Sequence, residues 1–464
     1  MRYISTRGAT PPQPFTEAVV TGLAPDGGLL IPEQIPDIRA HLDSWRSLGF
    51  VDLAKALLPH FIDDIPRATL DQLIDRAYSK FDHPDVVGFH ALAGTRGEVQ
   101  VLELFHGPTL AFKDIALQLL GQLFEYVLEA RAQHLNILGA TSGDTGSAAI
   151  AGVRGLPAVD IFIMYPNGRV SPLQELQMTT VLDPNVHCLA VEGSFDDCQN
   201  LMKTLFGDAA FKSRYALGAV NSVNWARVMA QIVYYGYASL RFGSSAPVSF
   251  CVPTGNFGNV FAGYLARRMG FPIDRLIVAT NANDILSVFF GTGRYQRGSV
   301  HHTMSPAMDI QVASNFERYL YYHFGEDAAR LNAFMETFAR SGCASIDPEA
   351  DGGQRVSAVL LATAVTEQET RDTIGRVYRD CGYVADPHTA VGLAAAERFA
   401  TAGTKVCIAT AHPAKFPESV NQAVGKPVAT HPALEALKGL ESRRTVIPAT
   451  VAAVRDYLQA HARA

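Results

Sequence analysis

The 464-residue sequence lacks the features that mark secreted, membrane-spanning or nucleic-acid-binding proteins. Its six cysteines form no C-x-x-C pair and no dense cluster, which indicates reduced thiols in a cytoplasmic protein rather than a disulfide framework. The formal net charge is −6, so the chain has no basic excess for binding nucleic acid. The longest apolar stretches, such as residues 359–365, are far too short to span a bilayer.

Several familiar motifs are also missing. Neither G-x-x-x-x-G-K-[ST] nor G-x-G-x-x-G occurs, so a nucleotide-binding interpretation has little support. The pair His301-His302 has no third ligand at helical spacing and no H-E-x-x-H is present, so we expect no metal site. Residues 1–15 contain no apolar core of a signal peptide, and we expect no cleaved leader.

What remains is the composition and pattern of a large α/β enzyme. A hydrophobic content of 48% with 18% charged residues fits a globular protein, and the length predicts two or three domains. Residues 1–90 indicate helices, whereas strand, loop and helix alternate from residue 99 onward, which favours mostly parallel sheets covered by helices. The expected strands cover residues 100–104, 135–140, 160–164, 186–190, 248–252, 275–280 and 405–410.

Lys113 is the most informative single residue. In the segment 105–114 it comes just after a Gly-Pro turn, where an apolar helix begins. A helix start carries partial positive charge, which disfavours an ammonium group nearby. A lysine held there and partly removed from water favours its neutral form, which is the form that attacks an aldehyde. On spacing alone, an ordinary solvated lysine is the better explanation of the residue.

Two glycine loops further along the chain favour the aldehyde-binding role of Lys113 over that of an ordinary surface lysine. In residues 135–149 and again in 248–263, an apolar strand leads into a loop of glycine and small polar residues, which opens onto a helix. Unpaired N–H groups at such helix starts bind anions, and glycine lets the backbone approach the ligand. One loop of this kind is explained by turn geometry. Two loops together with Lys113 predict a site for an aldehyde cofactor, its phosphate and a substrate carboxylate.

On these segments the chain resembles the threonine synthases, fold-type II pyridoxal-phosphate enzymes, in their longer bacterial and fungal form. The resemblance covers nearly the whole chain. The Lys113 segment and the segment 314–318 (Ser-Asn-Phe-Glu-Arg) are particular to this family. The other segments that carry the resemblance are residues 3–8, 140–146, 220–227, 255–259, 307–311, 386–390 and 411–416.

The resemblance implies an α/β fold of two mostly parallel, helix-covered sheets of the tryptophan synthase β-like kind. We expect residues 1–90 to form a mainly helical N-terminal domain and residues 135–221 a small mobile domain. Residues 91–134 and 222–464 would form the large cofactor domain. In such folds ligands bind beyond the carboxyl ends of the strands, so the site is expected in the crevice between the sheets.

The resemblance also implies how pyridoxal 5'-phosphate is held. Lys113 would carry the cofactor and later move protons. A hydroxyl in the region of Thr410 would face the pyridine nitrogen and leave the ring less protonated, although a strand-terminal threonine can simply cap the next turn. The residues that would cradle the cofactor phosphate are Gly255, Asn256, Phe257, Gly258 and Asn259.

The substrate would be held by two further groups of residues. Those that resemble the family's carboxylate loop are Ser142, Gly143, Asp144 and Thr145. Asp144 fits poorly beside an anion, so we expect its carboxylate to point away and to cap the helix or another donor, an interpretation with at least as much support as a catalytic role. Because the net charge is negative, a phosphorylated substrate needs cations placed locally.

The candidates for the substrate phosphate are Ser222, Asn224, Arg227, Asn315, Arg318 and Lys415. Arginine suits this task because its planar fork bonds two phosphate oxygens. We favour Arg318, because its segment distinguishes this family from related lyases. Arg227 is equally explained as a helix salt-bridge residue.

The implied reaction converts O-phospho-L-homoserine and water to L-threonine and phosphate, by a pyridoxal-phosphate-dependent lyase that is monomeric or homodimeric. Three alternatives stay open. A phospho-lyase would release a 2-oxo acid from the same substrate. A dehydratase or cysteine synthase type would need no phosphate clamp, and a cofactor-binding protein would show no turnover. The only expected partner is a small phosphorylated amino acid.

Overall fold

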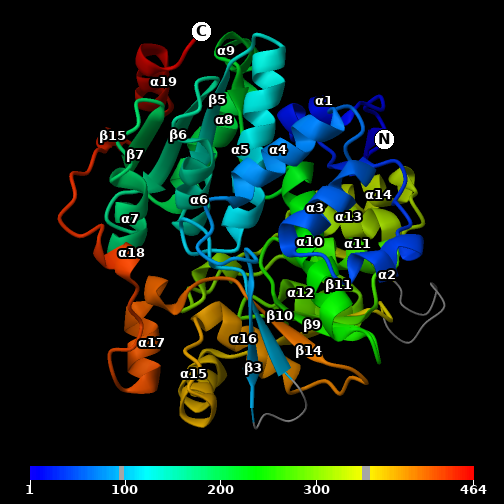
Figure 1. The fold of residues 1–464 in the computed structure, drawn as a ribbon. Helices are drawn as coiled ribbons and strands as arrows, with labels where there is room; N and C mark the ends of the chain where they lie inside the picture. The colour runs from blue at the N-terminus through cyan, green and yellow to red at the C-terminus, as the bar shows by residue number, and fades with distance from the viewer. Residues whose placement is uncertain (94–98, 347–355) are drawn as a thin grey trace.

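Strands rich in Val, Ile and Leu form two main sheets in the computed structural model, which describes residues 1–93, 99–346 and 356–464 (Figure 1). The larger sheet is parallel except for its edge strand β3. Strand β9 is buried along its whole length, as expected for a parallel sheet covered on both faces. Its strand order is β13 (Leu360–Ala364), β10 (Ile273–Thr280), β9 (Val248–Pro253), β14 (Lys405–Ala409), β4 (Val99–Glu103) and β3 (Gly88–Leu92).

The smaller sheet has five strands, all parallel. Two short antiparallel pairs stand apart from both sheets: β1 (Tyr3–Ser5) with β2 (Leu30–Pro32), and β11 (Arg294–Gln296) with β12 (Cys343–Ser345). The order in the smaller sheet is β15 (Thr445–Pro448), β7 (Val186–Glu192), β6 (Val159–Pro166), β5 (Leu135–Ala140) and β8 (Leu217–Gly218).

Helices cover both sheets. Helix α16 packs on β9, β10 and β14 of the larger sheet, and α8 packs on β5 and β6 of the smaller one. The helices of the first half of the chain are α1 (Phe15–Thr21), α2 (Leu42–Trp45), α3 (Phe50–Leu57), α4 (Arg67–Tyr78), α5 (Lys113–Ala130), α6 (Asp144–Val153), α7 (Pro172–Thr179), α8 (Phe195–Gly207), α9 (Ala209–Arg214) and α10 (Trp225–Phe242). Those of the second half are α11 (Gly258–Met269), α12 (Ile285–Thr292), α13 (Phe316–His323), α14 (Ala328–Ser341), α15 (Glu367–Cys381), α16 (Pro387–Ala396), α17 (Pro417–Val424), α18 (Pro432–Glu435) and α19 (Val451–His461).

Short 3-10 turns complete the described chain: η1 (Arg39–His41), η2 (Leu58–His60), η3 (Pro306–Met308) and η4 (Pro413–Lys415). Across residues 1–93, 99–346 and 356–464, no helix is both long enough and apolar enough to cross a membrane.

The fold class predicted from the sequence is confirmed: both main sheets are mostly parallel and covered by helices. The expected division of the chain differs from the structure at the C-terminal end. Strand β15 pairs with β7, and α19 packs on α8 and β15 (Figure 1). The last 20 residues therefore lie on the smaller sheet rather than with residues 222–444. Strand β15 is only four residues long and half exposed, so its apolar pattern is too weak to reveal this pairing.

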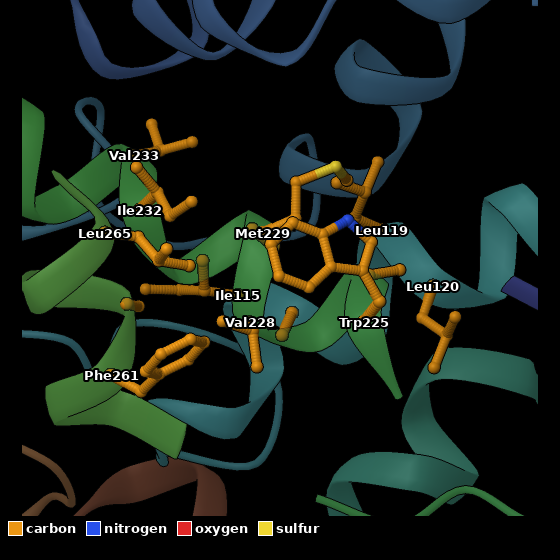
Figure 2. Close-up of a cluster of buried hydrophobic side chains, with 14 of the residues drawn as sticks. Ile115, Leu119, Leu120, Trp225, Val228, Met229, Ile232, Val233, Phe261 and Leu265 are labelled. Carbon is orange, nitrogen blue, oxygen red and sulfur yellow. The ribbon is translucent and has the colours of Figure 1, made fainter. Parts of the chain in front are cut away.

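The core next to the site is built from three helices, α5, α10 and α11. Helix α10 is buried along nearly its whole length and packs between α5 and α11 (Figure 2). The side chains labelled in this cluster are Ile115, Leu119, Leu120, Trp225, Val228, Met229, Ile232, Val233, Phe261 and Leu265.

Helices α5 and α6 touch through their backbones. A methyl group added at Gly121 would lie 2.0 Å from the carbonyl oxygen of Gly152, and one added at Gly152 would lie 2.5 Å from that of Leu117. Both glycines lie eight residues after the start of their helices, which begin at Lys113 and Asp144. The glycine contact therefore determines how the two helix starts meet.

We predict that Gly121→Ala lowers the free energy of unfolding by about 1–3 kcal/mol, because the added methyl forces the two backbones apart. Urea denaturation measures this. The matched control is Gly291→Ala in α12, where an added methyl meets nothing within 4 Å. That variant should be as stable as the parent or slightly more stable. Equal effects of the two substitutions would contradict a tight crossing of α5 and α6.

Candidate active site

Three neighbouring strands of the larger sheet lead into predicted site segments. Strand β4 leads to the turn before Lys113, β14 leads to Thr410, and β9 leads to the loop 254–258. These strands are adjacent and parallel, in the order β9, β14, β4, so their carboxyl ends lie at one edge. The N–H of Phe112 donates to the carbonyl of Thr410 at 2.8 Å. The structure thus brings Thr410 beside the turn that carries Lys113.

Lys113 is the first residue of α5, and its side chain is 12% exposed. Burial is the main reason that the pKa of Lys113 falls to about 8; Lys415 and Arg227 lower it further, and Asp144 opposes them. Its nearest carboxylate oxygen, Oδ2 of Asp144, lies 3.8 Å from Nζ. A pKa of about 8 leaves roughly a tenth of this amine unprotonated at pH 7, far more than for an ordinary lysine, and this neutral form can act as a nucleophile.

The turn that carries Lys113 is held by a buried carboxylate that the sequence analysis did not single out. Asp114 accepts hydrogen bonds from the N–H and the hydroxyl of Thr109, at 2.8 and 2.7 Å. Burial raises the pKa of Asp114 to about 6, although these bonds and Lys415 oppose the rise. The contact fixes the backbone from residue 109 to residue 114 and so determines where α5 begins.

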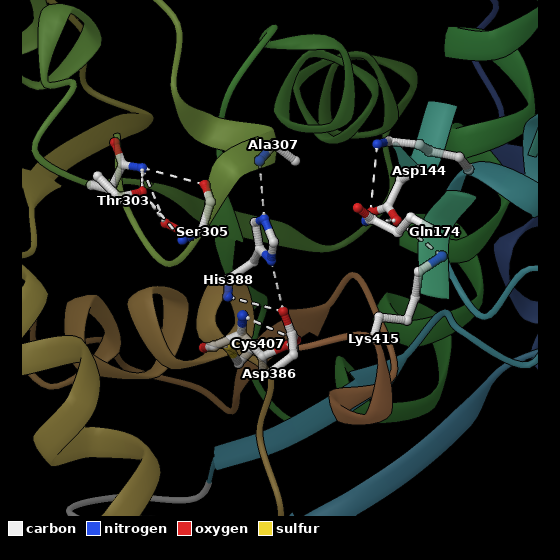
Figure 3. A network of polar contacts seen from close by, with 12 residues as sticks. Asp144, Gln174, Thr303, Ser305, Ala307, Asp386, His388, Cys407 and Lys415 are labelled. Atoms are coloured by element: carbon white, nitrogen blue, oxygen red, sulfur yellow. Dashed lines mark hydrogen bonds and ion pairs between the residues drawn. The ribbon is translucent and has the colours of Figure 1, made fainter. Parts of the chain in front are cut away.

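Asp144 lies between Lys113 and Lys415 at the start of α6, and Figure 3 shows its side chain beside Lys415 and Gln174. Its Oδ1 accepts from Nζ of Lys415 at 2.9 Å and from Nε2 of Gln174 at 2.8 Å. Burial alone would raise the pKa of Asp144, but Lys415 and Lys113 hold it well below its usual range. The carboxylate is therefore charged and already bound to protein donors, which is one of the two alternatives that the sequence left open.

The loop before α6 closes on the hydroxyl of Thr141. Its Oγ1 accepts from the N–H groups of Gly143, at 3.0 Å, and Gly146, at 2.9 Å. Gly143 has φ of +148°, which side chains rarely tolerate, and a methyl there would strike Gln174. The Gly143 N–H is thus not free for a substrate carboxylate. Ser142 is exposed and Thr145 half-buried, so these two remain the loop's available polar side chains.

The loop 255–259 has the shape of a backbone cradle. Phe257 adopts a left-handed conformation with φ of +65° while its ring is buried against Phe290 and Phe316. Helix α11 begins at the next residue, and the first N–H groups of a helix have no partner within it. A methyl at Gly255 would lie 2.5 Å from the Ala307 carbonyl. Backbone N–H groups at a helix start suit a phosphate, so this loop fits the predicted cofactor anchor.

The side-chain oxygen of Asn259 is occupied within the protein. Its Oδ1 accepts hydrogen bonds from Tyr234, at 2.7 Å, and Tyr235, at 2.8 Å, inside the core between α10 and α11. Asn256 joins the loop to α13, because its carbonyl accepts from the N–H of Asn315 at 3.0 Å. The side-chain oxygens of Asn256 and Asn259 bond to the protein. The backbone N–H groups at the start of α11 remain for an anion, and Nδ2 of Asn259 has no partner among the described residues.

Arg227 is buried in the first turn of α10. It is 4% exposed, and no described residue accepts a hydrogen bond from its Nε or Nη1. Burial lowers its pKa to about 10, and its charge is felt at Lys113. A buried cation at a helix start costs stability, both by desolvation and against the helix dipole. The salt-bridge explanation is therefore not supported, and the residue is suited to an incoming anion.

Arg318, the favoured phosphate residue, is placed elsewhere. Its side chain is fully buried, and it donates from Nε and Nη2 to the carbonyl of Leu30 at 3.1 and 2.8 Å. Nη2 also donates to the carbonyl of Val223 at 2.6 Å, and Nη1 donates to Oδ1 of Asn315. These donors are bonded to backbone carbonyls and to the Asn315 side chain, so Arg318 ties the N-terminal segment to the start of α10, which does not favour the predicted role at the substrate phosphate.

The remaining candidates also bond to the protein itself. Nδ2 of Asn315 donates to the carbonyls of Ser222 and Asn256 at 3.0 and 3.1 Å. Asn224 caps α10 and donates to the carbonyl of Val19. The hydroxyl of Ser222 lies 2.8 Å from that of Ser314 and can turn toward a ligand. Of this group, the structure leaves Ser222 and Arg227 as the side chains best able to bind substrate.

His388 also lies in this region, although it was not among the site residues predicted from the sequence. Nδ1 of His388 lies 2.8 Å from the Asp386 carboxylate, and its Nε2 accepts from the N–H of Ala307 at 3.2 Å (Figure 3). These contacts fix one ring orientation and connect α16 to the segment beside Gly255. An Asp-Pro-His start to an apolar helix is the signal that could have revealed it.

Comparison with known proteins accounts for this arrangement. Family models described as "Threonine synthase N terminus", "Pyridoxal-phosphate dependent enzyme" and "Threonine synthase, C-terminal" match residues 2–78, 89–341 and 389–458. Threonine synthase from Pseudomonas aeruginosa is 46% identical, over 99% of this chain and 98% of that protein. The one from Schizosaccharomyces pombe is also 46% identical, over 91% of this chain and 89% of that protein.

The chain belongs to the threonine synthase family. Its fold matches the crystal structure of pyridoxal-phosphate-bound threonine synthase from Brucella melitensis, with a TM-score of 0.96 and 44% identity over all of both chains. Enzymes of this family use pyridoxal phosphate, and the cofactor predicted from Lys113 and the glycine loops is confirmed at the level of the family.

The contrast between the two arginines is open to a stability test. Arg318→Met leaves buried carbonyl oxygens of Leu30 and Val223 without donors, so we expect the free energy of unfolding to fall by about 2–4 kcal/mol. Arg227→Met removes an unpaired buried cation and should leave stability unchanged or raise it. Urea denaturation of both variants measures the difference, and a greater loss of stability in Arg227→Met would contradict these assignments.

Proposed function

We propose that this chain converts O-phospho-L-homoserine and water to L-threonine and phosphate, the activity that the names of its relatives indicate. The proposal rests on the observation that the Arg227 guanidinium is buried, that its Nε and Nη1 have no partner among the described residues, and that its charge acts on Lys113. A doubly charged phosphate would satisfy that guanidinium through two parallel hydrogen bonds. Dehydratase or cysteine synthase chemistry would give Arg227 no comparable partner.

The residues fit pyridoxal phosphate well. Lys113 would carry it, the backbone of residues 255–258 would hold its phosphate, and the Thr410 hydroxyl would face its ring nitrogen. When bound, the cofactor supplies the electron sink that lets protons leave the carbons next to the substrate amine. The glycine at 255 and the left-handed Phe257 are the features of this chain that make room for it.

The chain's own groups would then manage protons and charge. Lys113 would take and return protons at the substrate carbons, because its amine is partly neutral near pH 7. Arg227 and Ser222 would hold the phosphate as it leaves. Charge grows on that group as the C–O bond breaks, so these contacts would strengthen in the transition state. Ser142 and Thr145 would orient the substrate carboxylate.

We further propose that residues 135–221, together with 445–461, move as a small domain over the site, and that the enzyme works in the cytoplasm as a monomer or homodimer. Closing the site would exclude bulk water, which strengthens each of the charge contacts named above. The only water then needed is the one that adds to the substrate.

Incubating the purified enzyme with O-phospho-L-homoserine tests the reaction. We expect L-threonine and inorganic phosphate in equal amounts, measured by chromatography and a phosphate assay. Phosphate accompanied by 2-oxobutanoate instead of threonine would show a phospho-lyase. No phosphate release, with turnover of an unphosphorylated amino acid, would show a dehydratase or cysteine synthase activity.

Arg227→Met should lower kcat/KM for O-phospho-L-homoserine on the order of a hundredfold or more, the usual cost of one lost charge-assisted contact in a closed site. Arg227→Lys should recover part of the loss, because an ammonium group cannot reproduce the planar fork. The absorption spectrum of the bound cofactor should stay that of the parent. Parental kcat/KM in Arg227→Met would rule out this residue as the phosphate clamp.

A further inference from the structure

Two carboxylates lie near Lys113, and the short hydrogen bonds of both are made with other groups. Asp114 accepts from the N–H and hydroxyl of Thr109. Asp144 accepts at Oδ1 from Lys415 and Gln174, at 2.9 and 2.8 Å, while its Oδ2 lies 3.8 Å from the Lys113 amine. A distance of 3.8 Å is longer than a hydrogen bond. A lysine buried beside a carboxylate ordinarily stays protonated through such a bond.

Lys415 is itself held in a fixed place. It ends the short turn η4, its side chain is buried, and its Nζ donates to the carbonyl of Thr109 at 2.6 Å. Thr109 belongs to the turn that carries Lys113, whereas Asp144 belongs to α6. The ammonium group of Lys415 therefore connects these two segments, with two of its three N–H groups occupied.

We propose that Lys415 is a positioning residue that draws the Asp144 carboxylate away from Lys113, so that the Lys113 amine loses its proton near neutral pH and can act as a nucleophile. The inference rests on the proposed role of Lys113 as the residue that carries the cofactor. It changes the role expected for Lys415, from a ligand of the substrate phosphate to a competitor for a carboxylate.

The charges that face Lys113 come from four elements: Asp114 on α5, Asp144 on α6, Arg227 on α10 and Lys415 on η4. Arg227 and Lys415 disfavour a proton on Lys113, and the two carboxylates favour one. Burial is the largest influence and also disfavours the proton. Removing Lys415 would therefore act twice in the same direction, because it deletes a repelling charge and releases Asp144 to bond Lys113.

The test measures the protonation of Lys113 directly, in full-length protein freed of cofactor by hydroxylamine and dialysis. Trace acetylation with acetic anhydride over a range of pH, followed by mass spectrometry of the Lys113 peptide, gives the pH midpoint of its reactivity. We expect Lys415→Met to raise this midpoint by about one pH unit or more, the effect typical of charges a few ångströms away. Asp144→Asn alone should lower it.

The double variant Lys415→Met/Asp144→Asn supplies the decisive control. With neither charge present, its midpoint should return from the high value of Lys415→Met toward that of the parent. Acetylation of the exposed Lys203 on α8 serves as the internal standard, and circular dichroism checks the fold of each variant. An unchanged or lower midpoint in a folded Lys415→Met protein would overturn the proposal.

If Lys415→Met does not fold, Lys415→Gln takes its place, because a glutamine can still donate to the Thr109 carbonyl without the charge that attracts Asp144. A higher midpoint in folded Lys415→Gln than in the parent supports the proposal, and equal midpoints overturn it. A role for Lys415 confined to the substrate phosphate predicts equal midpoints, since no substrate is present. The role of Lys415 and the proposed reaction are tested independently. If the parent enzyme released a 2-oxo acid, the proposed role of Lys415 would be unaffected. If the midpoints were unchanged, the proposed reaction would be unaffected.

Discussion

The parallel crossing of α5 and α6 at Gly121 and Gly152 is the constraint on which the site depends. Backbone contact at that point brings the two helix starts together, with Lys113 at one and Asp144 at the other. Both starts carry partial positive charge, so the space between them favours anions. Asp144 supplies one negative charge in this space. A phosphorylated, carboxylate-bearing ligand would supply further negative charge there.

The balance of buried charge supports the same conclusion. Three basic side chains, Lys113, Arg227 and Lys415, surround the site, and the nearby carboxylates Asp114 and Asp144 bond to Thr109, Lys415 and Gln174. Arg227 is left with unpaired donors, which costs stability in the free protein. Proteins keep such groups where a ligand supplies the missing partner. The protein's negative net charge is thus compatible with an anionic substrate, because the basic side chains around the site attract it locally.

The sequence was a good guide to the fold and to the loops, and a poorer guide to individual side chains. Strand periodicity located β5, β6, β7, β9, β10 and β14 within two residues, because those strands are long and buried. Short half-exposed strands such as β15 leave no comparable pattern. Arg318 and Arg227 could not be told apart by residue type or spacing. Tertiary contacts decide between them, since carbonyls from distant segments surround Arg318 and none of the described residues accepts from Nε of Arg227.

A crystal structure of the holoenzyme with a phosphonate analogue of O-phospho-L-homoserine tests the account most directly. The account predicts phosphonate oxygens within hydrogen-bonding distance of the Arg227 guanidinium, with Arg318 still bonded to the carbonyls of Leu30 and Val223 and Lys415 still bonded to Asp144. A phosphonate bound to Arg318, or one that leaves Arg227 without a partner, would contradict it.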